Sequence, residues 1–126
     1  MIMKIRTFFT IAAVVALVYA VGLLVVPGTL NTTYGLGASS SEKLLARFFG
    51  VDLLVIGIIL WLGRDLSGVS TRPIITSGLV GDAVGFIVAL VGTLRGTMNA
   101  TGWSAVLIYL LLTLGFAYYQ FMAPAK

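Results

Sequence analysis

Long apolar stretches alternate with short polar segments along the whole chain. A bilayer core of about 30 Å is crossed by about 20 helical residues, and each apolar stretch is close to that length. Glycine, proline, asparagine and charged residues gather in the segments between them. The pattern therefore predicts four membrane-spanning helices, over Thr7–Val26, Leu44–Leu62, Ile74–Leu94 and Trp103–Met122.

Composition supports a single all-α membrane domain over residues 1–126. Hydrophobic residues make up 60% of the chain and charged residues 10%, and the mean hydropathy is +1.11. A soluble domain carries about 25% charged residues, and a transmembrane β-barrel shows short alternating segments. We therefore expect an integral membrane four-helix bundle. A short similarity between residues 20–30 and 83–94, at the ends of the first and third spans, favours two helical hairpins in parallel orientation.

The net charge of +4 gives no sign of nucleic-acid binding, and the placement of lysine and arginine predicts the orientation of the chain. The basic residues stand singly near the span ends, and no cluster of four or more exists. If both termini are cytoplasmic, the inner side carries Lys4, Arg6, Arg64, Arg72 and Lys126, and the outer side carries Lys43, Arg47 and Arg95. This bias predicts cytoplasmic termini, although it is small enough to leave insertion in both orientations as an alternative.

Cysteine and histidine are both absent from the chain. Disulfides, thiolate metal sites, iron–sulfur clusters and imidazole-held haem therefore need groups that this chain does not have. We expect no metal site, no cofactor and no catalytic residues, which predicts a protein that is not an enzyme.

The longest polar segment, residues 27–41, is expected to be a loop. Pro27 and Gly28 are predicted to end the first helix. Ser41 is predicted to cap the second, without the reciprocal capping box because Glu42 follows it directly. Pro73 fits the first turn of the third helix, where a missing backbone N–H breaks no hydrogen bond.

Two carboxylates interrupt the apolar spans. Asp52 and Asp82 each lie about eight residues into a span, which places both near the middle of the bilayer. A charged aspartate there costs at least about 2.5–3.5 kcal/mol on insertion scales. We expect each to be protonated, hydrogen-bonded or paired, with Arg47 as one possible partner across a helix interface. Asp52, Asp82 and Arg47 form the candidate intramembrane polar site.

Small residues predict where the helices pack, because close backbone approach drives helix association in lipid. Asp82 shares its face with Gly78 and Gly85 and is expected at a helix interface with a hydrogen bond. Gly50 and Gly57 form a second face, about 200° around the helix from Asp52. We expect Asp52 in the bundle interior near Asp82, and Gly50 and Gly57 on a surface that packs against a partner outside the monomer.

A family resemblance rests on several short motifs: Val21–Pro27, Tyr34-Gly35-Leu36, Ala46–Leu54, Gly81–Gly85 and Gly102-Trp103-Ser104. Together they resemble small four-helix bacterial membrane proteins of uncharacterised, broadly DoxX-like type. The resemblance implies a four-helix bundle in a prokaryotic cytoplasmic (inner) membrane. It implies no agreed activity.

Three functions from different classes are consistent with these features. The favoured one is a non-catalytic accessory or structural subunit that packs against a larger membrane complex or its own copies, in contact with lipid. The alternative is a small oligomeric proton- or cation-coupled transporter that uses Asp52 and Asp82. A redox or quinone-binding enzyme ranks last, because the chain lacks cysteine, histidine and a polar cluster.

Overall fold

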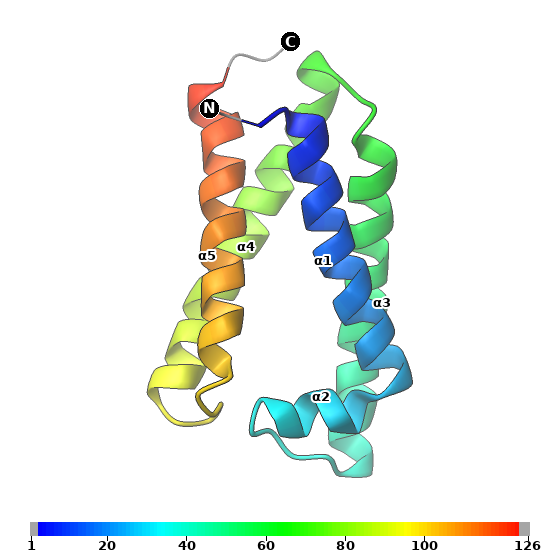
Figure 1. The fold of residues 1–126 in the computed structure, drawn as a ribbon, viewed down its shortest axis with the longest axis vertical. Helices are drawn as coiled ribbons and strands as arrows, with labels where there is room; N and C mark the ends of the chain where they lie inside the picture. Colours follow the sequence, from blue (N-terminus) through cyan, green and yellow to red (C-terminus); the bar gives the residue numbers. More distant parts are fainter. Residues whose placement is uncertain (1–2, 124–126) are drawn as a thin grey trace.

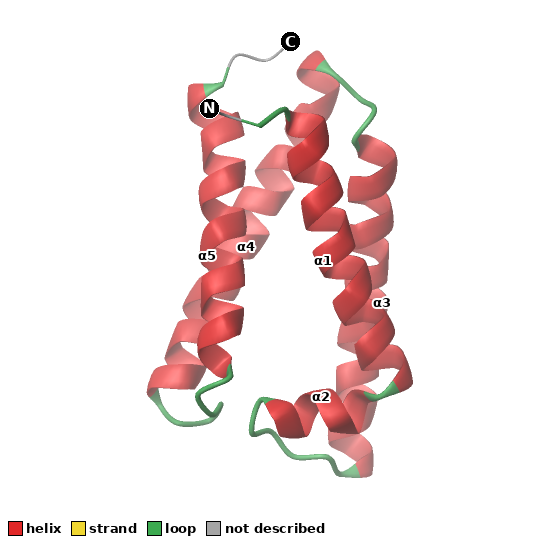
Figure 2. Cartoon of the chain, viewed as in Figure 1, coloured by secondary structure: helices red, strands yellow, loops and turns green. Residues whose placement is uncertain are grey.

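The computed structural model describes residues 3–123, and this part of the chain is helical without a strand (Figure 2). Five helices form in chain order, with a short 3-10 turn before the fourth and a π-helical turn after the fifth. They are α1 (Ile5–Val25), α2 (Pro27–Thr33), α3 (Ser40–Gly63), η1 (Gly68–Thr71), α4 (Arg72–Leu94), α5 (Gly102–Ala117) and η2 (Tyr118–Met122).

Four helical segments are long and apolar enough to cross a membrane, as the hydropathy pattern predicts. They are Ile5–Val25, Ser40–Gly63, Gly68–Leu94 and Gly102–Met122. The chain is therefore a multi-pass membrane protein by the length and composition of its helices. The second span begins four residues before the predicted Leu44, because the polar residues 40–43 form its first turn.

The helices form two hairpins, α1 with α3 and α4 with α5 (Figure 1). The hairpins meet at the end where α1 begins and η2 ends, and they spread apart toward the end where α2 lies. Their junction is an apolar cluster formed by Phe8, Phe9, Ala12, Ala13, Leu60, Ile75 and Phe116. This cluster is the main core of the described structure, so the two hairpins pack together chiefly at this end, which we call the closed end.

Aromatic rings from the two hairpins pack against each other in this cluster. Phe8 of α1 meets Phe116 of α5 edge to face, with ring centres 4.8 Å apart. Phe9 and Phe116 are 1% and 2% exposed. Gly115 leaves room for this contact, because a Cβ there would collide with the ring of Phe8. Aromatic packing therefore joins α1 to α5, although the two helices belong to different hairpins.

The segment after the first span is a short helix instead of the expected loop. Val26 has φ −130° and ψ 57°, which interrupts the α-helix, and Pro27 then begins α2. Proline favours this position because its φ is already helical and its missing N–H would have no helical partner. The Thr32 and Thr33 hydroxyls donate to carbonyls of the preceding turn. The prediction that the first helix ends at Pro27 and Gly28 is therefore confirmed, whereas the loop expected over residues 27–41 is wrong for residues 27–33.

The start of α3 also differs from the prediction. Ser39, not Ser41, is the N-cap residue. The Glu42 backbone N–H donates to the Ser39 hydroxyl at 3.3 Å, and the Ser39 N–H donates to the Glu42 carboxylate at 3.2 Å. The spacing of three residues forms the capping box that the choice of Ser41 excluded.

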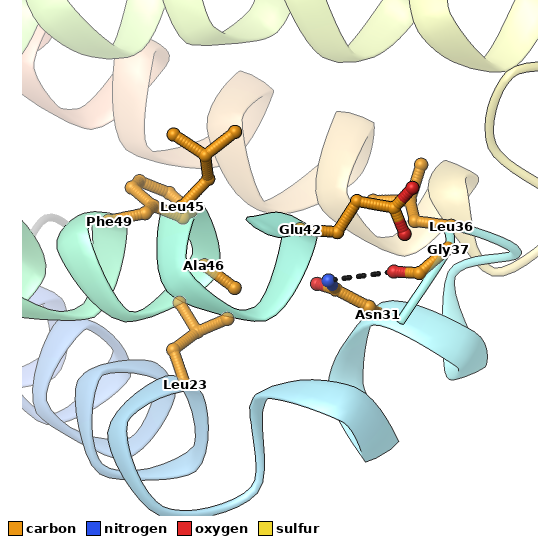
Figure 3. A pocket seen from close by; sticks show the side chains of 8 residues that line it. All are labelled: Leu23, Asn31, Leu36, Gly37, Glu42, Leu45, Ala46 and Phe49. Atoms are coloured by element: carbon orange, nitrogen blue, oxygen red, sulfur yellow. Dashed lines mark hydrogen bonds between the residues drawn. The ribbon is translucent and has the colours of Figure 1, made fainter. Parts of the chain in front are cut away.

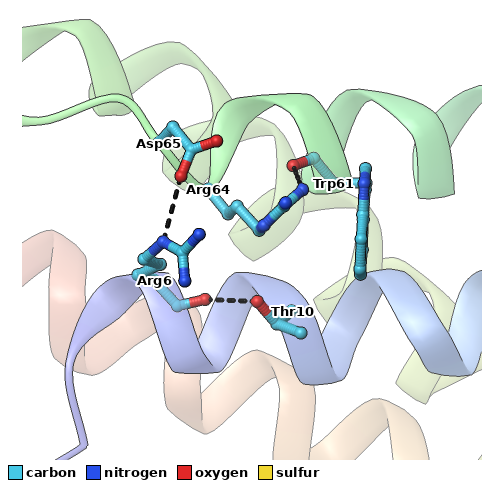
Figure 4. Close-up of polar contacts among 5 residues, drawn as sticks. All are labelled: Arg6, Thr10, Trp61, Arg64 and Asp65. Carbon is cyan, nitrogen blue, oxygen red and sulfur yellow. Dashed lines mark hydrogen bonds and ion pairs between the residues drawn. The ribbon is translucent and has the colours of Figure 1, made fainter.

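Polar contacts form at the C-terminal end of α3, near Gly63 (Figure 4). The Arg6 Nε donates to the Asp65 carboxylate at 3.0 Å, and this exposed ion pair is the one found among residues 3–123. Arg64 donates to the Trp61 carbonyl at 2.6 Å and lies 3.8 Å from the centre of the Trp61 ring. An exposed pair contributes little to stability, but these contacts place basic groups at the end of the bundle where α1 begins.

Candidate functional site: polar groups between the hairpins

Asp82 lies near the middle of α4, beside the interface with α5. Its neighbours Gly78 and Gly85 face α5, since a Cβ at Gly78 would be 2.5 Å from the Phe116 ring and one at Gly85 would collide with the Tyr109 ring. Asp82 is half-buried between these two positions. The prediction that Asp82 lies at a helix interface is therefore confirmed. The hydrogen bond predicted for its carboxyl is not formed with any described residue.

Asp82 also turns toward the space between the hairpins. Ile75, seven residues earlier, is 3% exposed and belongs to the core cluster that joins the hairpins. Seven residues are nearly two helical turns, so Asp82 lies on the same side of α4, two turns farther from the closed end. At that depth the backbones of the two hairpins are farther apart than at the closed end (Figure 1), and Asp82 is half-buried.

A chain of hydroxyl groups crosses between the hairpins near α2. The Tyr19 and Tyr34 hydroxyls are 2.7 Å apart, and the Tyr34 hydroxyl is 3.3 Å from that of Ser104 on α5. We call Tyr19, Tyr34 and Ser104 the hydroxyl bridge. The Tyr109 ring on α5 packs against Gly85 of α4, three residues after Asp82. Polar groups thus extend from the end of α2 toward the middle of the bundle.

Backbone contacts strengthen this bridge. The Asn99 backbone N–H donates to the Tyr34 carbonyl at 3.0 Å, and the Asn99 amide donates to the Thr33 carbonyl at 3.1 Å. Gly35 has φ +77° and lies against Asn99, where a Cβ would be 3.0 Å from the Asn99 backbone nitrogen. The end of α2 is therefore tied to the α4–α5 connection, and it links the hairpins at their open end.

Asp52 is exposed near the middle of α3, which differs from the predicted place in the bundle interior. Small residues explain the difference. Because Gly50 and Ala46 occupy the side of α3 that packs against α1, Asp52 is turned away from that contact. It forms no ion pair with a described residue.

Arg47 does not neutralise Asp52. Its Nε donates to the Leu24 carbonyl at 3.2 Å, near the C-terminal end of α1. Carbonyls in the last turn of a helix have no helical partner and carry partial negative charge. The Arg47 guanidinium therefore binds the end of α1 and does not pair with Asp52. The structure thus brings Asp82 and the hydroxyl bridge to the space between the hairpins, and it leaves Arg47 out of that group.

Gly50 and Gly57 lie inside the α1–α3 hairpin, which contradicts the prediction that they face an outside partner. A Cβ at Gly50 would be 3.2 Å from the Ala20 carbonyl oxygen, and one at Gly57 would be 2.6 Å from the Leu17 side chain. Ala16 and Ala20 are buried on the facing side of α1. The glycines and alanines form one close interface, so the surface expected for a partner is already occupied within the chain.

A second feature is a shallow groove among α1, α2 and α3 (Figure 3). Its walls are largely apolar, with Leu23, Ala46 and Phe49 among the lining residues. The Asn31 amide donates to the Gly37 carbonyl at 3.0 Å, and the Glu42 carboxylate is used in the α3 capping box. The polar groups of the groove are thus engaged in local structure.

The hydroxyl bridge escaped the sequence reading. Tyr19, Tyr34 and Ser104 belong to no recognisable motif in the sequence. Their contacts span 15 and 70 positions in the chain. A tyrosine inside an apolar stretch was the one available signal, because its hydroxyl needs a polar neighbour in lipid.

Tyr34→Phe tests whether the hydroxyl bridge holds the open end of the bundle. We expect a loss of about 0.6 kcal/mol and at most about 1.7 kcal/mol, the range for interhelical hydrogen bonds in membranes. The measurement is detergent-induced unfolding, with Tyr118→Phe as the control, since Tyr118 contacts the Tyr119 ring outside the bridge. Equal losses in both variants would contradict a stabilising role for the bridge.

No family model, curated protein or solved structure matches the chain. The resemblance to DoxX-like proteins therefore stays a prediction, and the function has to be argued from the arrangement of the side chains.

Proposed function

We propose that the chain is a non-catalytic accessory or structural subunit of a larger membrane assembly, in a prokaryotic cytoplasmic membrane as the DoxX-like resemblance implies. The observation that carries the proposal is the position of Asp52. It is exposed near the middle of a helix of membrane length, and it has no ion pair within the described residues. A charged aspartate facing lipid is unfavourable by at least about 2.5–3.5 kcal/mol, so a protein contact outside the monomer would stabilise it.

The surroundings of Asp52 support the same function. Phe48, Val55 and Ile59 share its side of α3 and are 60%, 51% and 48% exposed. Intramembrane carboxylates usually face protein or a water-filled space. An apolar face with a carboxylate at its centre has the composition of a helix–helix interface, whereas a lipid-facing surface would be apolar throughout.

Gentle extraction of the wild-type protein, followed by sizing and identification of what copurifies, tests this function. We expect a stoichiometric assembly larger than the monomer, and its loss in Asp52→Leu, because the leucine cannot replace the polar contact. Val84→Leu is the control, since Val84 is a 55% exposed position on α4. A monomeric wild-type protein, or an Asp52→Leu variant in an assembly of unchanged size, would contradict the proposal.

The alternative is a small oligomeric proton- or cation-coupled transporter that uses Asp52 and Asp82. The observation that favours it is the row of polar groups from Asp82 past Tyr109 to the hydroxyl bridge, because proton relays use such rows inside membranes. Purified protein in vesicles with an internal pH dye tests it. Proton or cation flux that is lost in Asp82→Asn would favour transport over the accessory function.

A further inference from the structure

We propose that the open side of the two hairpins receives one transmembrane helix of a partner protein, and that this helix carries a lysine or arginine near its middle that pairs with Asp52. The inference rests on the accessory function proposed above and names the chemistry of the partner. Four observations carry it: the length of the exposed face, its direction, a second carboxylate at a similar distance from the closed end, and the positions of the basic residues within 3–123.

The exposed face of α3 has the length of a helix contact. We call it the Asp52 face, formed by Leu45, Phe48, Phe49, Asp52, Val55, Ile56 and Ile59. Its apolar members are between 46% and 68% exposed. From residue 45 to residue 59 the face extends about 21 Å along the helix, about two thirds of the bilayer core. A long apolar strip of this kind suits a second helix better than a compact ligand.

The Asp52 face turns toward the other hairpin. Gly63 lies 11 residues after Asp52, which is close to three helical turns, so both residues lie on the same side of α3. A Cβ at Gly63 would be 2.5 Å from the Cδ1 atom of Ile74 on α4. Near the closed end this side of α3 therefore contacts α4. Farther along, the hairpins spread apart (Figure 1), and the same side is left uncovered.

Asp82 borders this open region at the same depth. Asp52 is 11 residues from the end of α3 at Gly63, and Asp82 is 10 residues from the start of α4 at Arg72. At about 1.5 Å per residue, the two carboxyls lie about 16 Å and about 15 Å from the closed end. A helix lying along the Asp52 face would thus have the Asp52 and Asp82 carboxyls at similar distances from the closed end, each measured along its own helix.

Among residues 3–123, no basic side chain at that level pairs with Asp52. Six of the seven basic residues within 3–123 lie at helix ends or in connections, and the seventh, Arg47, donates to the Leu24 carbonyl. A second copy of this chain would carry its described basic residues at the same positions, which do not reach the depth of Asp52. A partner helix with a central basic residue would offset two unfavourable intramembrane charges at once, its own and that of Asp52.

A synthetic transmembrane peptide of leucine and alanine with one central lysine is the probe for this proposal. The full chain is reconstituted in vesicles with the peptide. Association is measured by energy transfer from a dye on Val69→Cys of the chain to a dye on the peptide. This is a unique label, since the chain has no cysteine, and Val69 is 80% exposed in the 3-10 turn η1 that precedes α4. We expect association about tenfold tighter than that of the same peptide with leucine in place of lysine, as one polar contact between membrane helices gives.

Variants of the chain show whether Asp52 makes the contact. Asp52→Asn should remove the tenfold preference, and Asp52→Lys should bind a peptide with a central glutamate instead. Asp65→Asn is the matched control, because Asp65 pairs with Arg6 at the end of the bundle. Retained preference in Asp52→Asn, or equal binding of the lysine and leucine peptides, would overturn the proposal. The exchanged charge pair keeps the test informative if one variant folds poorly.

Two further outcomes would also overturn the inference. Tetraphenylphosphonium binding that depends on Asp52, without binding of the lysine peptide, would assign the site to small lipophilic cations. Energy transfer between copies of the chain alone that is lost in Asp52→Asn would assign the face to self-association. Failure of the peptide to bind, with native assembly still lost in Asp52→Leu, would contradict this inference and leave the accessory function standing.

Discussion

Replacing Gly50 and Gly57 together with leucine is expected to separate α1 from α3. A Cβ at Gly50 would lie 3.0 Å from the Leu23 Cβ and 3.2 Å from the Ala20 carbonyl, so neighbouring backbone would have to move. Overpacking of a close interface costs about 1–3 kcal/mol per site. Leucine favours helix more than glycine does, so the expected loss arises from the interface. Detergent titration followed by Trp61 fluorescence, in a Trp103→Phe background, measures it.

Gly81→Leu is the matched control for this double variant. Gly81 lies in a span as well, but no atom lies within 4 Å of the Cβ that a side chain there would add. We expect its stability to match that of the parent protein. A double variant that unfolds at the parent's detergent concentration would show that the glycines do not form a close interface.

Phe116→Ala should loosen the junction between the two hairpins more than any other single truncation. The ring is 2% exposed and packs against Phe8 and Phe9 of the opposite hairpin. The same change costs about 3–5 kcal/mol in a soluble core. We expect about 2 kcal/mol here, because the unfolded side chain lies in lipid, so the loss comes from packing alone.

The distance between the hairpins reports this effect directly. Spin labels at Val18→Cys on α1 and Leu107→Cys on α5 use exposed positions of a cysteine-free chain. The distance distribution should broaden in Phe116→Ala and stay narrow in Phe121→Ala, because Phe121 is 74% exposed. An unchanged distribution in Phe116→Ala would place the junction elsewhere.

The candidate site was partly visible in the sequence. An aspartate in an apolar span is conspicuous because ionised groups are expensive in lipid, so Asp52 and Asp82 could be named, as could the glycine neighbours of Asp82. The direction of Asp52 could not be predicted. It depends on which side of α3 packs against α1, and the small residues Gly50 and Gly57 suit a partner within the chain as well as one outside it.

The hydroxyl bridge shows a different limit. Tyr19 lies in α1, Tyr34 directly follows α2 and Ser104 lies in α5, and each looks unremarkable in its own stretch of sequence. Local signals are strong only where the partners are close in the chain. The Ser39–Glu42 capping box is such a case, and it was missed because Ser41 was chosen as the cap instead of a serine three residues before the glutamate.

By itself, the sequence determined that this protein has four helices of membrane length, because hydrocarbon requires long apolar segments with internally paired backbones. Tertiary structure decided how those helices meet. Lipid solvates one apolar face of a helix as well as another, so hydropathy cannot select a packing partner. Close contacts at Gly50, Gly57 and Phe116 made that selection, and they left Asp52 on the open side of the hairpins.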